Sequence, residues 1–338
     1  CMLDLNTPHW LVKQSMSSGC MDSTMLLGNA LSDEPWRKRV ENYLLALTQH
    51  LEAKYSNNIR AYLAACGMTD EWMDYSRGDD TKQKMEKYEQ WAAENSLPVP
   101  DRIPDSRQRL SSTHAALRDP EQDAASLKYW RFNSDLVADS IIHFTNFIRK
   151  NVPKERLIGS FYGYIMQLGV NRLVQCGHLA YEKLLASGSV DFIISPGAYA
   201  DHAMGGGGGF MSPNGTIHRY GRNYLHEIDH LTHSGNMTLT KHVSLSWMKA
   251  WADEKADIAG LRREFCRSLF HGTSLWWFDM WGSFYDSPKL VDEIGAYKKI
   301  YDRFADSDNH HRQTDDEMNN RNQAEESNKS SNNIVKDL

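Results

Sequence analysis

The chain has 338 residues, of which 41% are hydrophobic and 24% are charged, and its formal net charge is −6 at pH 7. This composition is typical of a globular protein with room for one large domain or two ordinary ones. The negative balance gives no electrostatic reason to expect a nucleic-acid partner. A membrane partner is not expected either, because no run approaches the roughly 18 apolar residues of a spanning helix.

The numbers of aromatic residues and cysteines favour some classes of protein and argue against others. The 10 Trp and 15 Tyr residues suit a core and also a groove for sugars. The five cysteines are scattered without CxxC pairing, so we expect neither a zinc ribbon nor a disulfide scaffold. The chain opens with CMLD, without the basic and apolar leader of a signal peptide, and the sequence leaves its compartment open.

Short apolar runs alternate with helical patterns along the chain, as in βα units around a parallel sheet. The pattern predicts six strands, over residues 3–5, 59–65, 157–164, 191–195, 222–227 and 274–278. It predicts helices over residues 33–55, 121–150, 173–187, 253–270 and 287–304. Asp33 and Pro35 are the N-terminal signals of the first of these helices.

The order of these units favours an α/β fold of the (β/α)8 TIM-barrel type over a doubly wound sheet. The long loops follow the strands, and no strand is followed by GxGxxG. We expect one barrel domain over residues 1–305, with a polar insertion at about 78–120 that contains one helix near 80–95. Residues 306–338 are almost devoid of apolar side chains, and we expect them to form a disordered tail.

Acidic side chains stand at or just beyond the ends of three predicted strands. Glu71 follows the second strand, Glu227 ends the fifth with Asp229 beyond it, and Asp279 follows the sixth. A barrel brings the carboxyl ends of its strands to one mouth, so Glu71 and Glu227 are expected to converge. Two facing carboxyl groups are what glycoside hydrolysis needs, but spacing alone leaves exposed loop acids as an equal alternative.

Several segments together resemble clan A glycoside hydrolases, specifically the β-galactosidase-like enzymes around family 42. They are LDLNTPHW (3–10), NIRAYLAACGMTDEW (58–72), GSFYGYIMQL (159–168), GHLAYEKLLASGSVDFIISPGAY (177–199), FMSPNGTIHRYGRNYLHEIDHLTH (210–233) and LWWFDMWGSFYDSP (275–288). These segments resemble strands three to eight of that barrel, in order, over roughly residues 1–305. The resemblance therefore implies an incomplete barrel whose first two strands lie upstream of Cys1.

The resemblance implies a retaining hydrolase of β-glycosides, with β-galactosides as the expected substrates. Glu71 is the implied acid/base and Glu227 the implied nucleophile, and neither a cofactor nor a metal is expected. Asp70 stands where the clan usually has Asn and is expected to bind the sugar 2-hydroxyl, and Tyr199 is expected to donate a hydrogen bond to Glu227. The predicted substrate-binding residues are Trp10, Asp70, Trp72, Tyr199, Trp276 and Asp279.

Other interpretations stay open at this point. One is a non-catalytic or degenerate barrel that binds carbohydrate without cleaving it. Another is a metal-dependent hydrolase using His226, Asp229 and His230, although no HExxH motif is present. The five glycines at 205–209 lack the Lys-Ser/Thr of a phosphate loop and are expected to form a flexible loop at the site. A carbohydrate is the expected partner, and the sequence leaves homo-oligomerisation open.

Overall fold

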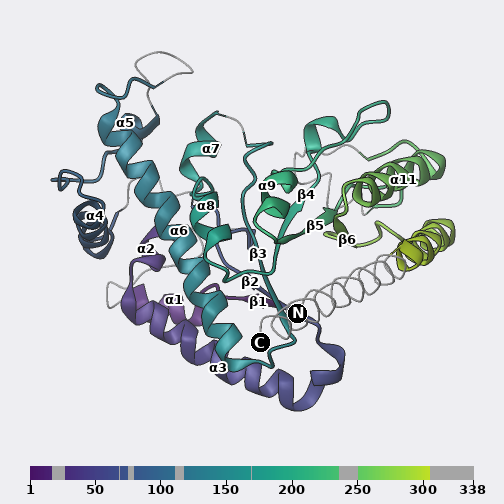
Figure 1. Cartoon of the computed structure of the whole chain (residues 1–338), viewed down its shortest axis with the longest axis horizontal. Coiled ribbons are helices and arrows are strands. Elements are labelled where there is room, and N and C mark those ends of the chain that lie inside the picture. The colour runs from purple at the N-terminus through teal and green to yellow at the C-terminus, as the bar shows by residue number, and fades with distance from the viewer. Residues whose placement is uncertain are drawn as a thin grey trace, which may run out of the picture. The chain divides into compact units, whose positions relative to one another are not determined.

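The computed structural model describes residues 1–16, 27–67, 69–74, 80–110, 118–168, 170–235 and 250–304 (Figure 1). The described chain divides into two compact units. The first comprises residues 1–230 and 270–278, and the second comprises residues 231–235, 250–269 and 279–304. The predicted tail over 306–338 lies outside the described residues, and the single barrel domain over 1–305 stays a prediction.

The first unit is built on one parallel sheet of six strands. These are β1 (Met2–Asp4), β2 (Ala61–Ala65), β3 (Leu157–Phe161), β4 (Phe192–Pro196), β5 (Asn223–Ile228) and β6 (Ser274–Trp277). Each strand pairs in parallel with the next strand along the chain, so the spatial order is the sequence order. Six consecutive parallel neighbours joined by helical connections are consistent with an incomplete (β/α)8 barrel, which confirms the predicted fold class.

Helices and short 3-10 turns fill the connections between the strands (Figure 1). They are α1 (His9–Met16), α2 (Leu27–Leu31), α3 (Glu34–Tyr55), η1 (Ser56–Asn58), α4 (Lys82–Glu94), α5 (Ser106–Leu110), α6 (Ala124–Asn151), α7 (Val170–Gln175), α8 (Tyr181–Ala186), η2 (Tyr199–Asp201), α9 (Asn214–Arg219) and α11 (Glu254–Phe270). A further helix covers residues 288–304. None of the described helices has both the length and the apolar character needed to cross a bilayer.

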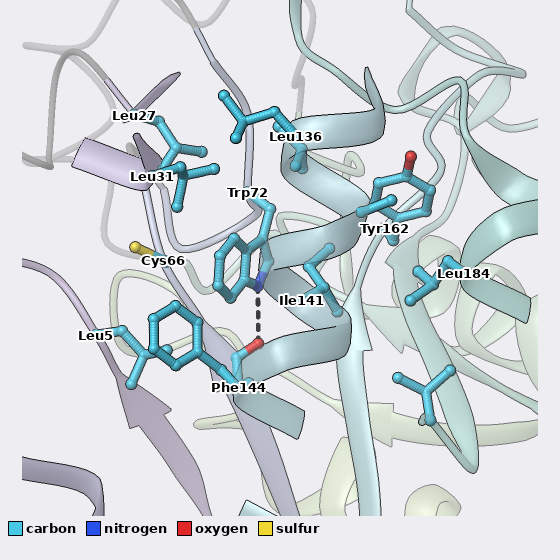
Figure 2. Close-up of a cluster of buried hydrophobic side chains, with 14 of the residues drawn as sticks. Leu5, Leu27, Leu31, Cys66, Trp72, Leu136, Ile141, Phe144, Tyr162 and Leu184 are labelled. Carbon is cyan, nitrogen blue, oxygen red and sulfur yellow. Dashed lines mark hydrogen bonds between the residues drawn. The ribbon is translucent and has the colours of Figure 1, made fainter. Parts of the chain in front are cut away.

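The two faces of the sheet carry different layers because side chains alternate along each strand. On the outer face, Tyr62, Ile158 and Ile193 belong to one core cluster with side chains of α6. Figure 2 shows part of this cluster, including Phe144 of α6 beside Trp72. A second cluster contains the alternate strand residues and covers the inner face; it includes Leu63, Ala65, Phe161, Tyr164, Phe192, Ile194 and Met211.

The helix predicted over 173–187 is two short helices, α7 and α8, and that prediction was wrong. Gly177 lies between them with a φ of +83°, a conformation that L side chains rarely adopt. A Cβ at this position would also come within 2.6 Å of Cγ2 of Val137 on α6. The chain therefore breaks at Gly177 and places His178 in a buried loop.

The second unit contains most of α11 and the helix over 288–304. Phe265 of α11 stacks on Tyr297 of the later helix with ring centroids 4.6 Å apart. The guanidinium of Arg262 is 3.0 Å from the carboxylate of Glu293 across the same pair of helices. A ring stack and an ion pair therefore join the two helices of this unit.

Candidate active site

Glu227 lies on β5, on the inner face of the sheet. Its register partners on the neighbouring strands are Pro196 and Trp276. In parallel strands, register partners point to the same face, which also carries Leu225 two residues earlier. The side chain of Glu227 is only 4% exposed, so the alternation of β5 places a carboxyl group where the strand would otherwise bury an apolar residue.

Glu71 lies in a tight turn after β2. Thr69, Asp70 and Trp72 in this turn all have a positive φ, and Glu71 forms an isolated bridge with Cys66. The hydroxyl of Thr69 donates a hydrogen bond to the Glu71 carboxylate. Glu71 as a whole residue is half-buried.

Glu71 and Glu227 lie close enough for the charge of one to act on the other, although they are far apart along the chain. Burial raises the pKa of Glu227 well above its usual range, and the charges of Asp229 and Glu71 raise it further. One Oε atom of Glu227 is buried without a hydrogen-bond partner among the described residues. Both glutamates stand at the carboxyl edge of the sheet, the edge on which barrel enzymes keep their chemistry.

Asp229 and Tyr199 complete this group of acidic and phenolic side chains. The Tyr199 hydroxyl donates a hydrogen bond to Asp229, so the predicted bond from Tyr199 to Glu227 was wrong. The pKa of Tyr199 is raised well above its usual range by burial, and next by Asp229. The sequence named Asp229 as an acid beyond the fifth strand and as a ligand in the metal-dependent alternative, but did not place it in the glycosidase site.

The histidines near Glu227 do not gather around a metal position. His226 lies on the opposite face of β5 from Glu227, where its ring meets the edge of Phe210 at a centroid distance of 5.0 Å. Nδ1 of His230 is 2.6 Å from Nδ1 of His202, and both rings are buried. Within the described ranges, no three His, Cys, Asp or Glu side chains are grouped as metal ligands. The arrangement therefore gives no support to the metal-dependent alternative.

Trp72 was predicted to bind substrate, and this prediction was wrong. Its side chain is 0% exposed and belongs to the core between the sheet and α6 (Figure 2). The indole Nε1–H donates a hydrogen bond of 2.9 Å to the Ala64 carbonyl. A ring that is enclosed in this way has no free face for a sugar.

Trp10 and Trp276 remain predicted substrate-binding residues. Trp10 is 63% exposed on α1, in the connection that follows β1. Trp276 lies beside Glu227 on the inner face, and its ring stacks on Phe278 at 5.1 Å. Both rings keep surface that a ligand could reach, because neither is fully buried.

Asp70 and Asp279 have local hydrogen-bond partners. Asp70 accepts a hydrogen bond of 2.8 Å from Asn6 Nδ2. Burial, followed by the charge of Asp4, raises the pKa of Asp70 to about 6. Asp279 belongs to the second unit, where its carboxylate accepts a 3.3 Å hydrogen bond from the Phe284 backbone N–H. The predicted roles of both residues in substrate binding stay predictions.

Known proteins match this chain in structure but not in sequence. No family model matches the chain, and no curated protein matches it. Ten chains of solved structure match, among them the catalytic domain of beta-amylase from Paenibacillus polymyxa, with a TM-score of 0.47 and 9% sequence identity. That match covers 71% of this chain and 61% of the beta-amylase chain, so this chain spans less than two thirds of it. Similarity at this level has no bearing on function.

Proposed function

We propose that this chain is a retaining glycoside hydrolase acting on β-glycosides, with β-galactosides as the preferred substrates. The observation that carries the proposal is the convergence of Glu71 and Glu227 at the carboxyl edge of the sheet. They arrive from different strands, and the charge of Glu71 contributes to raising the pKa of Glu227. Retaining glycosidases need two carboxyl groups that face each other across one scissile bond.

Each carboxyl group has a role in the proposed reaction. Glu227 attacks the anomeric carbon and forms a covalent glycosyl intermediate while Glu71 protonates the departing oxygen. Glu71 then removes a proton from water, which hydrolyses the intermediate. The half-buried position of Glu71 supports its role, since its carboxyl group must meet first the departing oxygen and then the incoming water.

The enclosed position of Glu227 supports a second candidate, a barrel that binds carbohydrate without cleaving it. A nucleophile must be ionised, whereas burial and two neighbouring acids favour the protonated form of Glu227. If substrate binding does not offset this effect, Glu227 stays neutral and acts only as a hydrogen-bonding group for the sugar.

A panel of nitrophenyl β-glycosides tests both candidates. We expect release of nitrophenol from the β-galactoside, and a loss of about 10²- to 10⁴-fold in Glu71→Ala. In Glu227→Ala, added azide should restore turnover and give a glycosyl azide of inverted configuration. Binding of sugars without release would favour the second candidate, and unchanged activity in Glu227→Ala would exclude Glu227 as the nucleophile.

A further inference from the structure

A cavity of about 680 Å³ borders α6, the end of α4 and the segment that joins α7 to α8. Helix α8 packs against α6 in this region (Figure 1). Sites for small molecules commonly have volumes of about 300–1,000 Å³, so this cavity has the size of a ligand site. None of the described residues that line it belongs to the two-glutamate site.

Apolar side chains make up much of the cavity wall. One face of α6 supplies residues at the spacing of helical neighbours, namely Leu127, Trp130, Arg131, Ser134 and Asp135. The α7–α8 segment adds Val174, Leu179 and Ala180. Leu179 is 43% exposed, so the cavity has an apolar side chain at its solvent edge. A ligand that fills this space therefore needs an apolar part.

Arg118 is a cation at this cavity that has no acidic partner. Its guanidinium carbon lies 4.4 Å from the centroid of the Trp130 ring, a cation–π arrangement. Its Nη2 donates to the backbone carbonyls of Arg109 and Leu110 over 3.4 Å and 3.5 Å. Among the described residues, no carboxylate pairs with Arg118, and its Nη1 is buried without a hydrogen-bond partner. The ring and the two carbonyls thus hold a positive charge in place without a counter-ion.

Two further polar atoms beside Arg118 have no hydrogen-bond partner within the described ranges. They are Nε1 of Trp130 and Oγ of Ser134, whose side chains are almost fully buried. An indole N–H and a guanidinium can only donate hydrogen bonds, and a hydroxyl can donate one as well. Buried donors without acceptors are rare in folded proteins. The polar groups at this cavity therefore match a ligand that supplies acceptor oxygens.

The acidic side chains of the cavity do not neutralise Arg118. Asp135 accepts a 2.7 Å hydrogen bond from Nε1 of Trp91. Glu182 is exposed, so water and salt screen its charge. Lys183 lies 2.7 Å from Asp139 and so already has an acidic partner. A negative charge on the ligand is the complement that Arg118 lacks.

We propose that this cavity binds a small organic acid, whose carboxylate pairs with Arg118 and whose apolar part lies against Leu127, Val174 and Leu179. A carboxylate is the planar acceptor that a guanidinium binds best. An inorganic anion would leave most of the apolar wall uncovered, and a neutral apolar ligand would leave Arg118 without a counter-ion. The inference is independent of the proposed function, because binding here involves neither glutamate and is measured without a glycoside.

Titration calorimetry of the intact chain with octanoate tests the proposal, with octanol and acetate as matched probes. Octanol keeps the apolar chain and lacks the charge, whereas acetate keeps the carboxylate and lacks the chain. We expect octanoate to bind at least about 10-fold more tightly than either, the factor for one hydrogen bond to a charged group. Equal affinities for octanoate and octanol would exclude the role of the carboxylate, and equal affinities for octanoate and acetate would exclude the apolar part. No binding of octanoate would mean that water alone occupies the cavity.

Arg118→Met locates the carboxylate, because it removes the charge and keeps most of the side-chain length. Its affinity for octanoate should fall about 10- to 100-fold, and its affinity for octanol should not change. Arg107→Met is the matched control, since Arg107 is an exposed arginine on α5 that does not line the cavity. Equal losses in the two variants would show a general effect of charge and overturn the proposal.

Leu179→Ala tests the apolar wall and does not depend on the folding of Arg118→Met. Because Leu179 is partly exposed, its truncation should leave the fold intact. The affinities for octanoate and octanol should both fall about 3- to 10-fold, as expected for the loss of apolar contact area. Unchanged affinities for both probes would place their binding elsewhere and refute the proposal.

Discussion

The Tyr199 hydroxyl donates a hydrogen bond to the carboxylate of Asp229, which lies two residues beyond Glu227. Tyr199 was predicted to donate this hydrogen bond to Glu227. It donates instead to Asp229, whose side chain is fully buried. Three carboxylates and two phenols therefore share one end of the sheet. Such a site is unstable in its fully ionised form, and its stability should depend on pH.

Glu227→Gln should stabilise the protein at pH 8. The pKa of Glu227 is raised in the folded state, so the folded protein favours the protonated form. The stabilising contribution of this group is complete below its usual pKa of about 4.3 and is lost as the pH rises. Gln does not titrate, so thermal unfolding should show a Tm about 2–4 °C higher at pH 8 for each kcal/mol of relief. The difference should shrink towards pH 4.

Glu264→Gln is the contrasting variant for this measurement. Glu264 is also a buried glutamate, but one Oε lies 2.8 Å from Nε of Arg263 and the other 3.6 Å from Nε of Arg267. Removing its charge leaves the arginines without that carboxylate, so Tm at pH 8 should fall. A fall of Tm in Glu227→Gln as well would show that Glu227 is not held at an electrostatic disadvantage.

Tyr199→Phe should destabilise the protein by about 1–3 kcal/mol, the range for leaving a buried polar group without its partner. Urea unfolding of Tyr199→Phe, Asp229→Asn and the double variant measures the coupling between the two side chains. Tyr224→Phe provides the control, because the Tyr224 hydroxyl is 2.7 Å from Ser195 Oγ on the outer face. Additive effects of Tyr199→Phe and Asp229→Asn would contradict the bond.

Trp72→Ala and Trp10→Ala separate a core tryptophan from an exposed one. Trp72→Ala should cost about 3–5 kcal/mol of stability, as large core truncations do, and leave KM of the folded fraction unchanged. Trp10→Ala should change stability by less than about 0.5 kcal/mol. If Trp10 stacks on a sugar, its loss should raise KM for nitrophenyl glycosides, and an unchanged KM would remove it from the predicted binding residues.

The parts of the fold that local sequence controls could be predicted, and those that depend on packing could not. Helix α3 was expected because Asp33 caps it, accepting from the Trp36 N–H at 3.2 Å, and Pro35 lies in its first turn. The break at Gly177 could not be foreseen, since it comes from a close approach to Val137 on another helix.

The residues of the candidate site also fall into those that local sequence could locate and those whose position depends on packing. Glu71 and Glu227 could be located because each stands at a strand end. Trp72 follows Glu71 directly, but the positive φ values of the turn direct it into the core, and sequence spacing carries no sign of this.

The predicted insertion at 78–120 is fixed by a buried charge network, which gives the last prediction. Lys84 on α4 is 0% exposed, and its Nζ lies 3.0 Å from Asp80 and 3.6 Å from Asp74. Lys84→Met keeps most of the side-chain volume but leaves two acids without this cation, so it should cost about 3–5 kcal/mol in urea unfolding. Lys82→Met is the control, because Lys82 pairs with Glu86 in solvent and should contribute less than about 1 kcal/mol. Equal effects of the two variants would mean that the buried lysine does not hold the insertion in place.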